Sequence, residues 1–329
     1  MMKSTRSWRL MALLGALALV AAACGGDDEG DGDAFRIAIV APSASNDLAF
    51  SQSIVDAVNA IQSEMGADAI DIAVTDGTFV VDDAATAVRG YANDGYDLVI
   101  AHGSQYGSFL PEIAGDFPDT AFAWGTASDT FGLPNVSSYT AAADEGAYVQ
   151  GVMAAMLSSS GKIGVVGPVD VGDASLYVQG FVNGAESGGA DVAVAFTGDF
   201  ADINLATEAA NAHVANGSDV MTGTAQMVVG AVGVAEQQNV LWFGTQSNQT
   251  SLADTVVVAS QVYKWEVILN DLIDQIKDGT LGGQTYEINL ANDGLVIEYN
   301  DAYDLPADVR QAADDAVAAI IDGSMNTGL

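Results

Sequence analysis

This sequence has few positively charged residues. Its 329 residues include 9 Lys and Arg against 44 Asp and Glu, a formal net charge of -35. Nucleic-acid binding needs cations that replace the counterions of the phosphates, and docking on anionic lipid needs cations too. The balance therefore argues strongly against nucleic acid as a partner and against electrostatic docking on a membrane. Solvation in a saline setting explains the charge better than a cationic ligand does, because net charge bears on solubility rather than on fold.

The residue types that carry most catalysis and metal binding are also scarce. The chain has two histidines, His102 and His213, and one cysteine, Cys24, so no internal disulfide can form. No Gly-x-Ser-x-Gly nucleophile motif occurs, and Gly161-Lys162 lacks the spacing of a phosphate-binding loop. His102 either lines a ligand site at the end of a predicted strand or faces a loop, and His213 suits the carboxyl end of a predicted helix. These absences favour a binding protein over an enzyme, and no cofactor or metal is expected.

The apolar run at residues 10–23 is too short for a comfortable membrane span. It follows Lys3, Arg6 and Arg9 and ends in small residues, an order that is typical of an export signal. The small residues directly before Cys24 resemble a bacterial lipobox, in which the cysteine is acylated and becomes the new N-terminus. The alternative is an ordinary signal peptide with an incidental cysteine.

We therefore expect a signal peptide at residues 1–23, followed by a lipidated Cys24 and a disordered acidic linker within 24–34. The linker sequence GGDDEGDGD cannot bury apolar area, and its spacing matches no EF-hand calcium loop. The mature chain would work at the outer face of the cell membrane, held there by the lipid.

Hydrophobic residues make up 50% of the sequence, and they alternate between short continuous runs and amphipathic segments. The run at 37–40 is typical of a strand buried on both faces of a parallel sheet, and Ile54, Val58, Ile61 and Met65 recur at helical spacing. Strands are predicted at 37–40, 70–74, 96–101, 120–124, 136–139, 162–166, 192–196, 219–221, 240–243 and 256–260, with a strand pair at 285–289 and 295–299. Helices are predicted at 54–65, 83–93, 109–117, 145–158, 176–186, 205–215, 228–238, 263–277 and 306–321.

This alternation occurs twice, and it predicts two α/β lobes. We expect the first part of lobe 1 at 35–135, the first part of lobe 2 at 136–243, and return segments at 244–329 that complete both lobes and the hinge. Ligands of open α/β sheets bind beyond the carboxyl ends of the strands. The loop at 43–50, after the first strand, is therefore expected to lie at a ligand cleft.

The order of short motifs along the chain resembles the basic membrane protein family of ABC-transporter substrate-binding lipoproteins, which includes purine nucleoside receptors of the PnrA type. The likeness covers nearly the whole mature chain. The motifs that carry it are Asn46-Asp47-x-x-Phe50-x-Gln52, Pro134-Asn135-Val136, Glu145-Gly146-x-Tyr148-x-x-Gly151, Gly161-Lys162-Ile163-Gly164, Tyr177-x-x-Gly180-Phe181-x-x-Gly184, Thr197-Gly198-x-Phe200-x-Asp202, and Lys264.

The resemblance implies a type I periplasmic-binding-protein fold, with two doubly wound parallel-sheet lobes joined by a multi-crossing hinge. It also implies that an aromatic side chain from each lobe sandwiches the ligand, and Phe50 and Tyr177 match those positions. Asp47 matches a family position that contacts the ligand. The alternatives are that Phe50 and Tyr177 are core residues, and that Asn46 or Asp47 caps the following helix. Offset stacking on aromatic rings suits a flat heterocycle.

The sequence departs from the family pattern at 244–249. The family commonly has Gly-x-Asp-x-Asp-Gln there, whereas this chain has the amides Gln246 and Asn248 at the acidic positions. An amide can still bind a hydroxyl but supplies no charge, so the resemblance implies that Lys264 loses a carboxylate partner. The expected ligand-binding residues are Asn46, Asp47, Phe50, Gln52, Ser104, Gln105, Tyr177, Thr224, Gln246 and Lys264.

The function that this combination implies is a lipid-anchored solute receptor of an ABC importer. It would capture a small polar heterocycle, with a purine nucleoside or base as the expected ligand, and deliver it to ABC permease subunits. The alternatives are a receptor of the same fold that signals to a membrane partner, and a receptor for a sugar-like or other non-nucleoside ligand.

Overall fold

The computed structural model describes residues 34–329. The expected signal peptide (1–23), the lipidation site Cys24 and nearly all of the acidic linker (24–34) lie outside the described residues. Within 34–329, no helix combines the length and the apolar character needed to cross a membrane.

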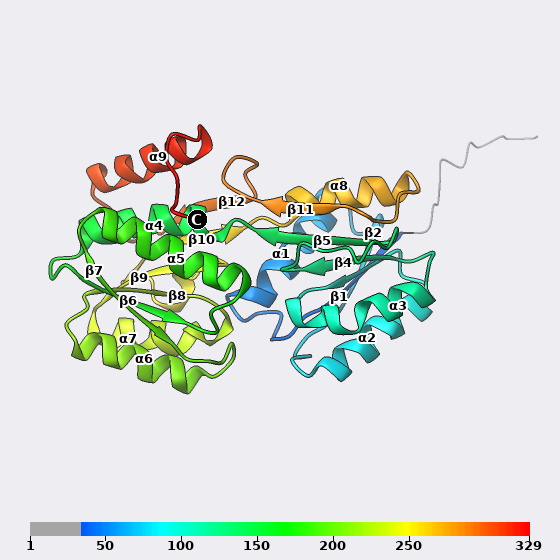
Figure 1. The fold of residues 1–329 in the computed structure, drawn as a ribbon, viewed down its shortest axis with the longest axis horizontal. Coiled ribbons are helices and arrows are strands. Elements are labelled where there is room, and N and C mark those ends of the chain that lie inside the picture. Colours follow the sequence, from blue (N-terminus) through cyan, green and yellow to red (C-terminus); the bar gives the residue numbers. More distant parts are fainter. Residues whose placement is uncertain (1–33) are drawn as a thin grey trace, which may run out of the picture. The chain divides into compact units, whose positions relative to one another are not determined.

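Two six-stranded sheets form the centres of two lobes (Figure 1). In the first sheet all strands are parallel and the order is β11-β5-β4-β3-β1-β2. Its strands are β1 (Phe35–Val40), β2 (Ile70–Thr75), β3 (Leu98–Ala101), β4 (Ala121–Gly125), β5 (Val136–Ala141) and β11 (Thr285–Ile288). In the second sheet the order is β12-β10-β9-β8-β6-β7, with β12 antiparallel to β10. Its strands are β6 (Lys162–Gly167), β7 (Asp191–Phe196), β8 (Val220–Gly223), β9 (Leu241–Gln246), β10 (Val257–Tyr263) and β12 (Leu295–Tyr299).

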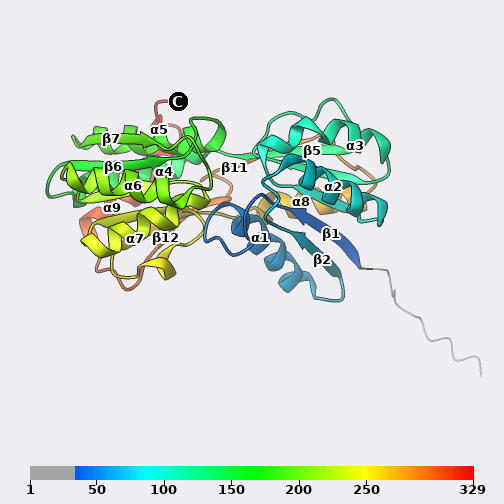
Figure 2. The same ribbon diagram turned by 90° about the horizontal axis from the view of Figure 1, so that it is seen from below.

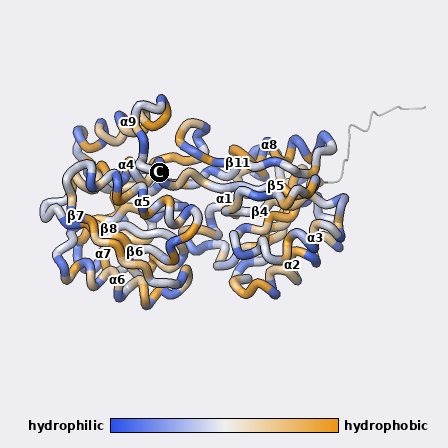
Figure 3. Tube along the Cα trace, in the orientation of Figure 1, coloured by the Kyte–Doolittle hydropathy of each residue, from blue (hydrophilic) through white to orange (hydrophobic). Residues whose placement is uncertain are grey.

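Helices cover both faces of each sheet, as the buried, continuously apolar strands require (Figure 2). The first lobe contains α1 (Phe50–Met65), α2 (Val81–Asn93), α3 (Leu110–Asp116) and α8 (Glu266–Lys277), with the short 3-10 helix η1 (Ser104–Ser108). The second lobe contains α4 (Ala143–Leu157), α5 (Gly172–Ser187), α6 (Ile203–Ala215), α7 (Val229–Gln238) and α9 (Ala307–Ile321), with η2 (Gln226–Val228) and η3 (Thr250–Leu252). The outer helices alternate between hydrophilic and hydrophobic residues, because each packs one face inward (Figure 3).

The chain passes between the lobes at 141–143, 263–266 and 288–295. These crossings correct two expectations. The strand β5 was expected to open lobe 2 at residue 136, but it pairs with β4 in the first sheet, so the first lobe extends to Ala141. The strands β11 and β12 were expected to pair with each other, but β11 pairs with β5 and β12 with β10. Both errors have one cause: alternation along a sequence does not fix which strands are neighbours in a sheet.

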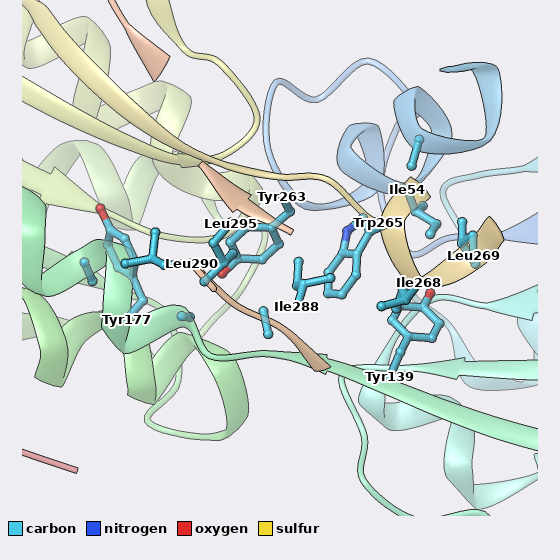
Figure 4. Packing of buried hydrophobic residues seen from close by; sticks show 14 of the residues in the cluster. Ile54, Tyr139, Tyr177, Tyr263, Trp265, Ile268, Leu269, Ile288, Leu290 and Leu295 are labelled. Carbon is cyan, nitrogen blue, oxygen red and sulfur yellow. The ribbon is translucent and has the colours of Figure 1, made fainter. Parts of the chain in front are cut away.

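The largest buried cluster runs through the crossings and joins the cores of both lobes. It extends from Tyr139 in the first lobe through Trp265 and Tyr263 to Tyr177 in the second (Figure 4). The Trp265 ring packs edge-on against Tyr139 and Tyr263, with ring centroids 5.0 and 5.3 Å apart. Its indole N–H donates to the Ser53 hydroxyl at 2.9 Å. Burial of this side chain therefore stabilises the hinge side of the cleft.

Glycines let α4 and α5 approach until their backbones touch. A Cβ atom on Gly184 would collide with the Tyr148 carbonyl, and one on Gly180 would collide with the backbone of Asp144. Conversely, a Cβ on Gly151 of α4 would meet the Phe181 carbonyl of α5. The repeated glycines in these motifs are thus explained by helix packing on the second sheet.

Candidate ligand-binding site

A cavity of about 370 Å³ lies between the two lobes, in the size range of small-molecule sites. Its walls are the segments that directly follow β1, β2, β3 and β4 in the first lobe and β6, β7, β8 and β9 in the second. The strand order reverses between β1 and β3 and again between β6 and β8, and ligands of such sheets bind beyond these switch points. The topology of both sheets therefore converges on the same cavity.

Aromatic side chains from both lobes line this cavity. Phe50 begins α1 after the first strand, and Phe200 lies in the loop between β7 and α6. Phe79, between β2 and α2, lies at the cavity with 47% of its surface exposed. Phe50 and Phe200 are each half-buried, so part of each ring is free for a ligand.

The buried ring of His102 packs against the ring of Phe50. The two rings stack with centroids 4.1 Å apart and planes 19° from parallel. The His102 Nδ1 atom lies 2.7 Å from the Tyr139 hydroxyl, and Nε2 lies 3.2 Å from the Phe50 carbonyl oxygen. Since the carbonyl can only accept, Nε2 donates to it and Nδ1 accepts from Tyr139. His102 is fully buried and does not line the cavity, so neither expectation for it was right: it positions a lining residue instead.

Burial lowers the pKa of His102 from 6.5 to about 3. Below pH 6.5, His102 therefore binds a proton in the unfolded chain but stays neutral in the folded chain. The free energy of unfolding falls as the pH drops. For this one group the loss between pH 7 and pH 5 is about 2 kcal/mol. Unfolding in urea at both pH values measures this loss. Between pH 7 and pH 5, we expect the free energy of unfolding of wild type to fall by about 2 kcal/mol more than that of His102→Gln. A difference that stays constant with pH would show that His102 is not held neutral.

Polar side chains line the cavity from both lobes, and two of those on the second lobe have unpartnered atoms. The Gln246 side chain ends β9, is 3% exposed, and leaves its Oε1 atom buried without a hydrogen-bond partner among the described residues. Asp173 of α5 likewise has a buried Oδ2 atom without a partner there. Ser104, Gln105 and Gln226 also line the cavity. Unpaired buried polar groups cost free energy, so these atoms are suited to receive a ligand.

The backbone at this cavity is strained at three positions. Thr126, Ala225 and Gln246 line the cavity and have φ angles of 55°, 72° and 72°, in the left-handed region that side chains other than glycine rarely adopt. Such strain costs of order 1–3 kcal/mol per residue and is concentrated at functional sites. All three residues lie just at or after the end of a strand, where the strain directs the chain around the cavity.

Asp47 caps α1 and does not line the cavity. Its carboxylate accepts from the backbone N–H groups of Ala49, Ser51 and Gln52 at 2.9–3.1 Å, and from the Ser43 hydroxyl at 2.7 Å. The capping alternative is therefore the one that the structure shows, and Asp47 rather than Asn46 is the cap.

Two neighbours of Asp47 also lie away from the cavity lining. Asn46 is exposed, and no hydrogen bond to it occurs within residues 34–329. Gln52 accepts from the Leu48 N–H at 2.9 Å and donates to Asp56 at 3.2 Å. Both were expected at the ligand, and the structure places both at the helix start.

Asp47→Ala is expected to lower the free energy of unfolding by about 1–2 kcal/mol, because the N–H groups of Ser51 and Gln52 in the first turn of α1, and that of Ala49 directly before it, lose their acceptor. Denaturant unfolding measures the loss. The matched control is Asn46→Ala, one residue away and exposed, which should leave stability unchanged. Equal effects of the two substitutions would contradict the assignment of the cap.

Tyr177 was expected to stack on the ligand, and it does not line the cavity. It is completely buried, and its hydroxyl lies 2.7 Å from both Gln150 Oε1 and Thr222 Oγ1 in the core of the second lobe. The aromatic residue that the second lobe brings to the cavity is Phe200. Its motif, Thr197-Gly198-x-Phe200-x-Asp202, was available from the sequence, and its position directly after a strand was the signal that could have identified it. Thr224 is buried beside the lining residue Ala225, with its hydroxyl unpartnered among the described residues.

A smaller, more polar cavity of about 170 Å³ adjoins the same side chain, since Gln246 lines both cavities. Lys264 lies there and forms an ion pair with Glu298, with Nζ 2.9 Å from Oε1. Asn248 donates to the other oxygen of Glu298 at 2.8 Å. The expectation that Lys264 lacks a carboxylate partner is thus corrected: Glu298, on β12, provides one, and Lys264 lowers its pKa.

The described part of the chain contains no group of three or more His, Cys, Asp or Glu side chains arranged to hold a metal ion. The described lining of the larger cavity offers aromatic rings for stacking, polar groups for hydrogen bonding and the carboxyl group of Asp173.

Comparison with known proteins identifies a family with this architecture. A family model described as ABC transporter substrate-binding protein, PnrA-like, matches residues 34–322. A purine-binding protein of Brucella abortus is 29% identical over 246 residues, which cover 74% of this chain and 69% of that protein. An ABC transporter nucleoside-binding protein of Lactococcus lactis is 28% identical over 214 residues, covering 58% and 60%. A transcriptional activator protein of Bacillus subtilis is 23% identical over 264 residues, covering 79% and 80%.

Solved structures agree on the fold. An ABC transporter solute-binding protein of Conexibacter woesei superposes with a TM-score of 0.74 at 23% identity, covering 89% of this chain and 98% of that chain. A solute-binding protein of Aeropyrum pernix superposes with a TM-score of 0.76 at 18% identity, covering 89% and 92%. The expected fold, two parallel-sheet lobes of the type I periplasmic-binding class, is confirmed. With its family model matched over 34–322, this chain belongs to the PnrA-like family of ABC transporter substrate-binding proteins.

Proposed function

We propose that this protein is the extracytoplasmic receptor of an ABC importer and that it captures a purine nucleoside or base in the cavity between its lobes. The observation that carries the proposal is one cavity with an aromatic ring from each lobe, Phe50 and Phe200, and unpaired polar atoms along one wall. Rings favour a flat ligand, and polar atoms favour one with hydrogen-bonding edges. A purine has both.

The ribose of a nucleoside is expected to extend from the larger cavity toward the smaller one. Gln246 joins the two, and its amide can accept from one hydroxyl and donate to another group. The Lys264–Glu298 pair lies beyond it, where the carboxylate and the ammonium can both bind sugar hydroxyls. A free base would fill the larger cavity alone.

Contacts from both lobes would make the ligand favour the closed arrangement of the lobes. A ligand shifts such an equilibrium only by its differential affinity, and residues from both lobes provide this difference. The relatives named for purine and nucleoside binding support the same ligand class. The lipobox-like sequence before Cys24 supports anchorage by lipid at the outer face of the membrane, where ABC permease subunits would receive the ligand.

A second candidate function is sensing. It is favoured by one observation, the likeness to a relative named as a transcriptional activator. A sensor would bind its ligand in the same cavity but pass the signal to another protein instead of a permease. Neighbouring permease and ATPase genes would support uptake, and a neighbouring histidine kinase gene would support sensing.

The ligand is tested by mass spectrometry of small molecules released from the purified protein, followed by calorimetric titration with purine nucleosides and bases, riboflavin and sugars. We expect a purine compound to be released and rebound. Selective binding of a sugar without a base would contradict the proposal.

A further inference from the structure

One charged side chain among the described lining residues of the larger cavity has no role yet. Asp173 lies in the first turn of α5, directly after β6 at the switch point of the second sheet. The preceding Gly172 has a φ angle of 56°, which bends the loop so that residues 171–174 border the cavity. Backbone N–H groups at a helix start favour negative charge. The fold thus holds a carboxyl group at the cavity wall.

This carboxyl group has no partner of opposite charge. Its Oδ2 atom is buried without a hydrogen-bond partner among residues 34–329, and the hydrogen bonds that its carboxylate accepts there come from the backbone N–H groups of Asp173 itself and Ala174. The described cations lie elsewhere: Lys264 is paired with Glu298 and lines the smaller cavity. Burial raises the pKa of Asp173 to about 6, so the group is mostly ionised at neutral pH although nothing in the described chain neutralises it.

The groups that face Asp173 from neighbouring elements do not change this. Tyr263 of β10 leaves its buried hydroxyl unpartnered among the described residues, and burial, together with the negative charge of Asp173, raises the pKa of that phenol well above 10. Tyr177 of the same helix is also neutral, since burial raises its pKa. An unpaired buried carboxylate costs free energy in the empty protein, and a ligand that donates to it recovers that cost.

The geometry points to Asp173 as the residue that selects the ligand's ring: its carboxylate accepts from adjacent N–H donors on the edge of the base, so that guanine is preferred to hypoxanthine and hypoxanthine to adenine. This inference rests on the proposed function and specifies its ligand. Guanine presents a ring N–H next to an exocyclic amine, a pair that matches the two carboxylate oxygens. Hypoxanthine presents the ring N–H alone, and adenine presents an acceptor at that ring position. The soft terminal torsion of an aspartate lets both oxygens turn toward such an edge.

The test is calorimetric titration at pH 7.5 of the full-length protein, stripped of ligand, with guanosine, inosine and adenosine. Wild type is expected to bind guanosine at least about tenfold more tightly than adenosine, with inosine between them. Asp173→Asn should weaken guanosine binding at least about tenfold, change adenosine binding by less than about threefold, and bring the three affinities together. The matched control is Asp170→Asn: Asp170 is exposed, its carboxylate binds the Ser175 hydroxyl, and it does not line the cavity. It should leave all three affinities unchanged.

Thermal unfolding gives a second readout that a merely structural aspartate would not give. Removal of a buried charge without a cationic partner is expected to raise the melting temperature of ligand-free Asp173→Asn by about 2–4 °C. Added guanosine should raise the melting temperature of Asp173→Asn less than that of wild type. This inference would be overturned if wild type bound the three nucleosides with equal affinity, or if Asp173→Asn weakened the binding of all three equally. The proposed function would stand in both cases. If no nucleoside binds wild type, the proposed function and this inference both fall.

Discussion

Phe200→Ala is expected to weaken binding of a purine nucleoside about 10- to 100-fold. Stacking of a base on an aromatic side chain contributes about 1–3 kcal/mol, which corresponds to about 5- to 150-fold in affinity and includes this range. Phe200 lines the cavity from the second lobe and is half-buried, so the substitution removes a ligand contact while leaving the core intact. Calorimetric titration measures the loss.

Two further variants sharpen this prediction. Phe196→Ala, four residues earlier on β7, removes a ring that is 44% exposed and does not line the cavity, so affinity should not change. Phe50→Ala should weaken binding as Phe200→Ala does, and it should also lower stability because the ring stacks on His102. Full affinity in both Phe50→Ala and Phe200→Ala would show that the rings do not hold the ligand.

Gly184→Ala is expected to lower the free energy of unfolding by more than about 3 kcal/mol. The added methyl group would collide with the Tyr148 carbonyl of α4, and a backbone atom cannot move aside as the end of a side chain can. Overpacking in a rigid interior costs about 1–3 kcal/mol, and more where backbone must shift. Denaturant unfolding with a probe in the second lobe measures the effect.

The control for this variant is Gly233→Ala in α7 of the same lobe. A Cβ atom there meets nothing within 4 Å, so alanine should raise stability by up to about 1 kcal/mol through helix propensity. If Gly184→Ala were as stable as wild type, the close contact between α4 and α5 would not constrain the fold.

The elements of the fold were predictable because many strands, such as β1 and β3, are continuous apolar runs and many helices have an apolar face. The partners of the strands were not. The strand β5 follows β4 closely and looks like the start of a new series, yet it pairs with β4, and the crossing comes only at α4. Which sheet an edge strand joins depends on contacts between segments far apart in sequence, as with β11 beside β5.

The candidate site, like the fold, could be predicted only in part. Phe50 and Gln246 were expected from the family resemblance, and Ser104 and Gln105 follow a predicted strand. All four line the cavity, although their contact with a ligand stays a prediction.

The errors concern side-chain direction. Tyr177 and Asp173, four residues apart, share one face of α5. Asp173 borders the cavity at the start of the helix, whereas Tyr177, one turn further along, is buried in the core of the second lobe. The ion pair joins Lys264, directly after β10, to Glu298 of β12, and only the folded sheet makes these two strands adjacent.

A crystal structure of the protein grown with guanosine tests the central claim most directly. The account predicts the base in the cavity between Phe50 and Phe200, its donor edge at Asp173, its ribose toward Gln246, and the lobes closed around it. A nucleoside bound outside this cavity, or a cavity that stays empty at saturating guanosine, would contradict it.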